Sequence, residues 1–183
     1  MTTDPWPTRL LDLDEFRALP DDDRRSELVE GVLSVTPPPS VRHQRIADRL
    51  ARAVDDALPV EHCAVTAVGI VLEGGPTPTV RVPDVVVVRH DAVDDRPDLD
   101  ASDVLAVVEV LSPGSRRRDR MVKLAEYAEA GIPRYAIVDP GPPVVLTAFA
   151  LDGGRYGEGA EHRGRTVVDL GCPIPVDLAT LAG

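Results

Sequence analysis

Two carboxylates occur inside apolar stretches of the sequence, where an ionised side chain is costly to bury. Asp84 lies in VPDVVVV at residues 82–88, and Glu109 lies in VLAVVEVL at residues 104–111. Continuous apolar runs of this kind are typical of strands covered on both faces of a sheet. Either acid alone is explained equally well by a nearby arginine or by backbone donors. Two acids on neighbouring strands repel each other, which favours a divalent cation between them.

The residue types around these acids favour a hard cation over zinc. The carbonyl of Val110 follows Glu109 directly and is available as an uncharged oxygen ligand. The two cysteines, Cys63 and Cys172, lie far apart in the sequence and form no paired-cysteine zinc motif. Oxygen ligands without a cluster of Cys or His predict Mg²⁺ or Mn²⁺ as the ion.

Two further residues are candidates for the same site. Glu27, in SELVEG at residues 26–31, either completes a metal shell or is an exposed strand residue. His43 follows Ser40 near the start of an expected helix. A histidine in such a place is either a cap or surface residue, or a catalytic group.

Lysine is nearly absent from this chain. Of the twenty basic residues, Lys123 is the one lysine and the others are arginines. Asp119, Lys123 and Tyr127 follow one another at spacings of four, so they share one stripe of an expected helix. Either Lys123 reaches back over the sheet toward the acids, or Asp119 and Lys123 form an ordinary solvated pair of about 0.3–0.5 kcal/mol.

A cluster of arginines precedes this lysine, at Arg116, Arg117, Arg118 and Arg120. The helix macrodipole favours anions at a helix start, so local helix stability does not explain four cations there. Guanidinium groups beside the free amides of a helix start are suited to phosphate, although a solvated charged face is an equal alternative. The net charge of −11 excludes a cationic protein coat, so a polyanion has to be bound locally.

The pattern of apolar residues and breakers predicts an α/β (α+β) fold in which helices cover a mixed sheet. The expected order from about residue 41 to 139 is helix, three strands, helix, strand. The helices are expected at 41–58, with Ile46, Leu50, Val54 and Leu58 on its buried face, and at 115–130, with an apolar stripe of Met121, Leu124, Ala125 and Ala128. The strands are expected at 64–72, 80–88, 104–111 and 135–138, with additions at 10–36 and 144–170.

The length and composition favour one domain over residues 1–183, and nothing in the sequence marks a boundary between two domains. No apolar run reaches the roughly 20 residues of a membrane span, and residues 1–9 lack a signal-peptide pattern. We therefore expect a cytoplasmic protein that does not enter a membrane.

In order and spacing, these motifs resemble the Uma-two family of restriction endonucleases in the PD-(D/E)xK nuclease superfamily. The resemblance rests on several segments spread over most of the chain: SELVEG at 26–31, the region of His43, PDVVVV at 83–88, VVEVLSP at 107–113, the D-x-x-x-K-x-x-x-Y pattern at 119–127, and GIPRYAIVDP at 131–140.

The resemblance implies a restriction-endonuclease-like core and a metal-dependent endonuclease that hydrolyses DNA phosphodiester bonds. It implies Asp84, Glu109 and the Val110 carbonyl as Mg²⁺ ligands, with Glu27 as an additional acid. The lysine that the superfamily usually has two residues after the glutamate is Leu111 here, so Lys123 would have to supply the ammonium. A possible homodimer is also implied.

The departure at Leu111 and the acidic net charge favour an alternative from another class. That alternative is a catalytically inactive nuclease-fold module that binds nucleic acid or protein. A small-molecule hydrolase or transferase has no substrate motif in the sequence and ranks last.

Overall fold

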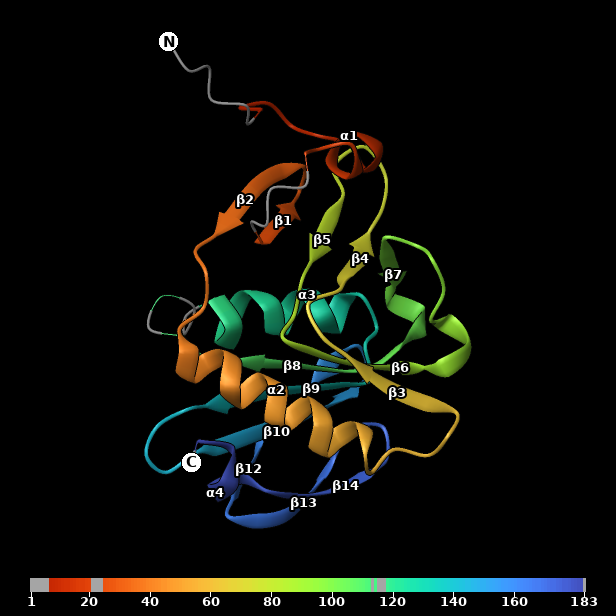
Figure 1. The fold of residues 1–183 in the computed structure, drawn as a ribbon. Coiled ribbons are helices and arrows are strands. Elements are labelled where there is room, and N and C mark those ends of the chain that lie inside the picture. Colours follow the sequence, from red (N-terminus) through yellow and green to blue (C-terminus); the bar gives the residue numbers. More distant parts are fainter. Residues whose placement is uncertain (1–6, 21–24, 113, 115–117, 183) are drawn as a thin grey trace.

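The computed structural model describes residues 7–20, 25–112, 114 and 118–182 (Figure 1). Among these residues the strands form a large central sheet, a second sheet and a two-stranded hairpin. The central sheet has the strand order β11-β10-β9-β8-β6-β3, and β12 also pairs with β10. Its strands are β3 (His62–Val65), β6 (Val85–Arg89), β8 (Val104–Val110), β9 (Arg134–Asp139), β10 (Val145–Asp152), β11 (Arg155–Tyr156) and β12 (Ala160–Arg163).

Two helices cover opposite sides of the central sheet (Figure 1). On one side, α2 (Val41–Asp55) packs Ile46, Leu50 and Val54 against the sheet, as the sequence predicts. The same side is also covered by β13 (Arg165–Asp169), β14 (Pro173–Asp177) and α4 (Leu178–Leu181). The other side is covered by α3 (Lys123–Glu129) and the second sheet. Coverage on both sides explains why the central strands read as continuous apolar runs.

The expected order of helix, three strands, helix and strand is present as α2, β3, β6, β8, α3 and β9. Strand β8 runs antiparallel to β6 and parallel to β9. A parallel neighbour requires a crossover connection, and the segment that contains α3 makes that crossover.

The second sheet was not expected from the sequence, which placed the additions on one mixed sheet. It has the order β2-β1-β5-β4-β7 and lies beside the central sheet (Figure 1). Its strands are β1 (Arg25–Val29), β2 (Val32–Thr36), β4 (Gly69–Glu73), β5 (Thr79–Arg81) and β7 (Asp98–Asp100). Helix α1 (Leu13–Arg17) and the 3-10 turns η1 (His90–Ala92) and η2 (Ala101–Asp103) complete the N-terminal half.

The prediction of two long strands at 64–72 and 80–88 is wrong, because each segment divides between the two sheets. The first divides at Ala67, whose φ of 53° lies in the left-handed region and ends the extended backbone. The second divides between Arg81 and Val85, where Pro83 has no N–H for a strand ladder. The break at Pro83 leaves Asp84 at the junction of the sheets.

The second predicted helix differs from its expected form within the described residues. It begins as a π-helical turn, η3 (Arg118–Val122), and continues as α3. Because a π turn has i→i+5 hydrogen bonds, the residues rotate away from the 3.6-residue period. Met121 is 62% exposed and Ala125 is exposed, so the expected apolar stripe is wrong at those two positions. No helix among the described residues has the length and apolar character needed to span a bilayer.

Candidate active site

The strand register brings the two acids of the apolar strands together. Val85 of β6 pairs with Val108 of β8, so Asp84 lies beside Glu109 at the end of the strand pair. Residues that face each other across an antiparallel pair share a face of the sheet. Asp84 is 7% exposed and Glu109 is 3% exposed. The predicted convergence of two buried carboxylates is confirmed.

Asp84 is held by three groups from distant parts of the chain. Its Oδ1 accepts a hydrogen bond of 2.8 Å from Arg25 Nη1, and its Oδ2 accepts one of 2.8 Å from the Val110 amide. His43 Nε2 lies 3.2 Å from the same Oδ2. Burial opposes ionisation of Asp84, but His43, Arg25 and the Val110 amide outweigh it and lower its pKa to about 2. Asp84 is therefore a fixed anion near neutral pH.

Glu109 has a different environment. Its Oε1 accepts hydrogen bonds from Lys123 Nζ at 2.6 Å and from the Tyr127 hydroxyl at 2.9 Å. Burial raises the pKa of Glu109 to about 7, the nearby Asp84 and Asp119 carboxylates add to the rise, and Lys123 opposes it. Its second oxygen, Oε2, accepts no hydrogen bond from the part of the chain that the structure describes.

Lys123 reaches the sheet and lies among three buried acids. Its ammonium is 2.6 Å from Glu109 Oε1, 3.2 Å from Glu27 Oε1 and 3.9 Å from Asp119 Oδ1. Burial lowers the pKa of Lys123, but the carboxylates of Glu109 and Glu27 outweigh this and raise it. The hypothesis that Lys123 reaches back over the sheet is confirmed, and the solvated-pair alternative is wrong because the lysine is 5% exposed.

Glu27 lies in the same cluster, so its interpretation as an exposed strand residue is wrong. It is 2% exposed, and its carboxylate accepts hydrogen bonds from Arg81 Nη1 at 2.9 Å and from the Val82 amide at 3.2 Å. Arg81 in turn donates to both carboxylate oxygens of Glu126 on α3, at 2.8 Å and 2.6 Å. This paired network fixes Glu27 beside Lys123.

His43 is buried beside Asp84, and a surface position is thereby excluded. The Ser40 hydroxyl caps α2 by accepting a hydrogen bond of 3.2 Å from the backbone amide of His43. The cap does not use the imidazole, whose Nε2 lies beside Asp84. Burial lowers the pKa of His43, but the Asp84 carboxylate and the Val110 backbone outweigh it and raise the pKa. His43 Nδ1 is buried without a hydrogen-bond partner among the described residues.

These side chains line one pocket of about 420 Å³ between the end of the central sheet and the segment that joins β2 to α2. Its lining includes Arg25, Glu27, His43, Asp84, Glu109, Val110, Asp119 and Lys123. Arg25 and Asp119 were not among the predicted site residues. The sequence predicted Asp119 only on one helical stripe with Lys123 and Tyr127. Arg25 follows an acidic turn that gives no indication of a site.

The donor set fits a hard cation, with one condition. Asp84, Glu109 and the Val110 carbonyl supply only oxygen, as Mg²⁺ and Mn²⁺ prefer. In the structure, however, Arg25 and Lys123 pair with the two carboxylates, and the described residues contain no group of three or more His, Cys, Asp or Glu side chains placed to hold a metal ion. An ion that binds Asp84 Oδ1 therefore has to replace the Arg25 guanidinium.

The predicted arginine cluster is described only in part. Arg116 and Arg117 lie outside the described residues, and Arg118 begins the π-helical turn η3. Arg120 is exposed, and its Nη2 lies 3.7 Å from Asp139 Oδ2. A role of this cluster in phosphate binding stays a prediction.

The raised pKa of Glu109 predicts how stability depends on pH in metal-free buffer. Between pH 4.5 and 7 the folded protein keeps a proton on Glu109 that the unfolded chain has lost, so the free energy of unfolding falls as pH rises. The full effect is about 3 kcal/mol. We expect urea unfolding of the Glu109→Gln variant to lack this fall.

Because the pKa of His43 is raised, its contribution to the free energy of unfolding also falls as pH rises above 6.5. The lowered pKa of Asp84 changes the free energy of unfolding only below pH 3.8. The difference between wild type and Glu109→Gln isolates Glu109 because both proteins retain His43. Equal pH slopes in the two proteins would show that Glu109 is ionised throughout the range.

Comparison with known proteins gives a family and a fold. The model of the Uma2 family, described as "Putative restriction endonuclease", matches residues 13–178. Among solved structures, a putative nuclease belonging to DUF820 from Anabaena variabilis has a TM-score of 0.71 and 16% sequence identity. The match covers 93% of this chain and 97% of that one. No curated protein matches the chain.

Proposed function

The chain belongs to the Uma2 family of restriction-endonuclease-like proteins, and we propose that it is a divalent-metal-dependent endonuclease that hydrolyses DNA. Family and fold point to a nuclease. The observation that carries the finer proposal is the buried Asp84–Glu109 pair with the Lys123 ammonium 2.6 Å from Glu109 Oε1, in one pocket. Two buried acids that could hold a metal ion, with a lysine beside them, support phosphodiester hydrolysis as the chemistry of this pocket.

Asp84, Glu109 and the Val110 carbonyl would hold the ion. When bound, Mg²⁺ supplies positive charge beside the phosphate and lowers the pKa of water. Lys123 would donate a hydrogen bond to the attacking water or to a phosphate oxygen as negative charge develops there. No covalent bond between protein and DNA is needed.

Two other residues have supporting roles in this proposal. His43, with its Nε2 3.2 Å from Asp84 Oδ2, is a positioning residue that fixes the carboxylate and keeps it ionised. Arg25 balances the charge of Asp84 while the ion is absent. Once it leaves Asp84, its guanidinium is free to bind a phosphate oxygen at the edge of the pocket.

The catalytically inactive module remains a second candidate function, and a specific observation favours it. Each buried acid of the site already has a cationic partner from the chain itself, through Arg25, Arg81 and Lys123. Leu111 also occupies the position where the superfamily usually has its lysine, and it is buried in the apolar core. A protein that has lost its chemistry would tolerate both features.

Metal removal separates the two candidates. We expect the wild-type protein to nick supercoiled plasmid DNA with Mg²⁺ or Mn²⁺ and to leave it intact in excess EDTA. Asp152→Asn removes an exposed carboxylate of β10 that lies outside the pocket. It is the matched control for substitutions of the site carboxylates, and it should cleave DNA normally. DNA that is bound but not cleaved with either metal, in supercoiled, linear and single-stranded form, would contradict the enzyme and support the module.

A further inference from the structure

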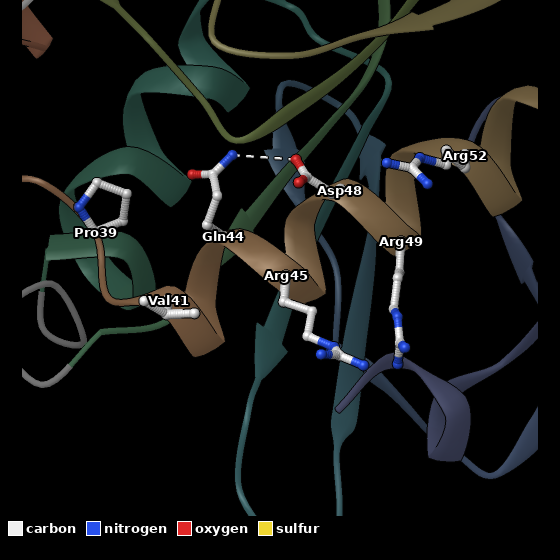
Figure 2. A pocket seen from close by; sticks show the side chains of 7 residues that line it. All are labelled: Pro39, Val41, Gln44, Arg45, Asp48, Arg49 and Arg52. Carbon is white, nitrogen blue, oxygen red and sulfur yellow. Dashed lines mark hydrogen bonds between the residues drawn. The ribbon is translucent and has the colours of Figure 1, made fainter. Parts of the chain in front are cut away.

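The outer face of α2 carries three arginines next to the candidate active site. Arg45, Arg49 and Arg52 line a groove of about 540 Å³ together with Pro39, Val41, Gln44 and Asp48. Figure 2 shows Arg45 and Arg49 extending from one edge of the helix, with Gln44, Asp48 and Arg52 on the other. We call the three arginines the α2 arginine face. The opposite side of the same helix is buried in the core, so the face is held rigidly.

The charges of this face are not compensated by the part of the protein that the structure describes. Arg45 and Arg52 are exposed, and none of the three arginines forms an ion pair with a described residue. Arg49 donates instead to the backbone carbonyls of Thr180 and Leu181. Like charges at a spacing of four repel each other and destabilise a helix by about 0.2–0.5 kcal/mol.

This lack of compensation is unusual in a chain with 31 acidic residues and a net charge of −11. The one acid in the groove, Asp48, accepts a hydrogen bond of 3.1 Å from Gln44 Nε2 rather than from an arginine. Arg45 and Arg52, the two exposed arginines of the face, are therefore left for an anionic ligand.

The groove and the active-site pocket adjoin each other. Pro39 lines both, and the first turn of α2 contributes His43 to the active-site pocket and Val41 to the groove. Val41 is 86% exposed, so it presents an apolar contact between the two. From Arg45 to Arg52 the helix rises about 10 Å, a length that corresponds to about three phosphates of one strand along a duplex axis.

We propose that the α2 arginine face binds the sugar-phosphate backbone of the DNA substrate on one side of the scissile phosphate. This inference rests on the proposed function, because the active site defines where the strand lies. We assign these guanidinium groups to phosphates and sugars, contacts that fix the position of the strand without reading its base sequence. It provides an acidic protein with a local site for a polyanion.

The test measures DNA binding without divalent metal, so that no cleavage occurs. We expect Arg45→Ala/Arg52→Ala to bind a fluorescently labelled 20-base-pair duplex about tenfold more weakly than wild type near 0.1 M salt, by anisotropy. The slope of log affinity against log salt should fall by about 2, roughly one for each phosphate that the variant no longer binds. Unchanged affinity and slope would overturn the proposal.

A matched variant controls for the loss of positive charge alone. Arg155→Ala/Arg163→Ala removes two exposed arginines, one from β11 and one from β12, two strands that both pair with β10. It should change neither the affinity nor the salt slope. A loss of affinity equal to that of the α2 variant would show general attraction and not a site.

A small substrate separates this inference from the proposed function. Bis(p-nitrophenyl) phosphate has a single phosphate and no flanking phosphate for the α2 arginine face to bind, so the double variant should hydrolyse it at the wild-type rate with Mn²⁺. If neither protein cleaves plasmid DNA or the small substrate, but the double variant binds DNA more weakly than wild type, the proposed enzyme is refuted and the proposed binding surface is retained. If the double variant dissociates a dimer in sedimentation velocity while DNA affinity stays constant, the face is a contact between copies of the chain and the proposal fails.

Discussion

Lys123→Ala is expected to slow DNA cleavage strongly and to destabilise the protein at the same time. The ammonium lies 2.6 Å from Glu109 Oε1 and 3.2 Å from Glu27 Oε1, and it is 5% exposed. Removal of one donor to a developing oxyanion lowers the rate by about 10²–10³-fold. Removal of one partner of a buried ion pair costs about 3–5 kcal/mol, because the remaining carboxylates lose their counter-charge.

The two effects are separable by measurement. Urea unfolding gives the stability, and plasmid cleavage with Mg²⁺ well below the unfolding transition gives the activity. Lys123→Arg keeps a positive charge among the acids, so it should recover part of the stability while activity stays low, because the guanidinium cannot occupy the ammonium position. If Lys123→Ala cleaves DNA at the wild-type rate, the proposed relocation of the lysine is wrong.

Asp84→Asn is expected to have the second large effect, on metal binding. The amide leaves the size of the side chain unchanged but removes the charge that an ion needs, so Mn²⁺ should bind at least about 100-fold more weakly. DNA cleavage should fall by at least about 10³-fold, because the ion's charge stabilisation is worth several kcal/mol. Isothermal titration calorimetry with Mn²⁺ measures the affinity directly.

Two further variants test this prediction, one expected to bind Mn²⁺ more tightly than wild type and one expected to bind it normally. Arg25→Ala removes the guanidinium that pairs with Asp84 Oδ1 at 2.8 Å, so it should bind Mn²⁺ more tightly than wild type. Asp103→Asn replaces another buried, arginine-paired carboxylate that lies outside the pocket, and should bind Mn²⁺ normally. Equal affinity in wild type and Asp84→Asn would place any ion elsewhere on the protein.

The central acids of the site could be predicted from the sequence because their chemistry conflicts with their surroundings. Asp84 and Glu109 interrupt apolar runs that only buried strands contain, and the structure places both at the ends of such strands. Lys123 was identifiable by the spacing of four that it shares with Asp119 and Tyr127, all three of which are buried. Local sequence is enough to predict a site residue where a charged residue interrupts an apolar segment.

The partners of these residues could not be predicted, because the contacts join segments that are far apart in the chain. Arg25 meets Asp84 across 59 residues, and Arg81 meets Glu27 across 54. Arg81 did carry a usable signal, since it is a cation in the buried strand β5, two residues before Pro83. The same reasoning that selects Glu109 would have selected Arg81. Arg25 stands among charged residues and has no such contrast.

Strand breaks and the π-helical turn also depend on tertiary structure. The segments at 64–72 and 80–88 are apolar enough to be expected as single strands, but each of them divides between two sheets, at Ala67 and at Pro83. The turn at Arg118–Val122 rotates Asp119 and Lys123 inward and leaves Met121 in solvent. The free energy gained by pairing buried charges on the sheet is larger than the free energy lost by exposing one methionine. Residue periodicity alone does not show which of the two is larger.

The most direct test of the central claim is a crystal structure with Mn²⁺ that uses its anomalous scattering. The proposed site predicts an anomalous peak about 2.0–2.3 Å from one oxygen of Asp84 and one of Glu109, with Arg25 displaced from Asp84. If saturating Mn²⁺ gives no peak there and Arg25 and Lys123 still neutralise the two acids, metal-dependent hydrolysis at this site is refuted.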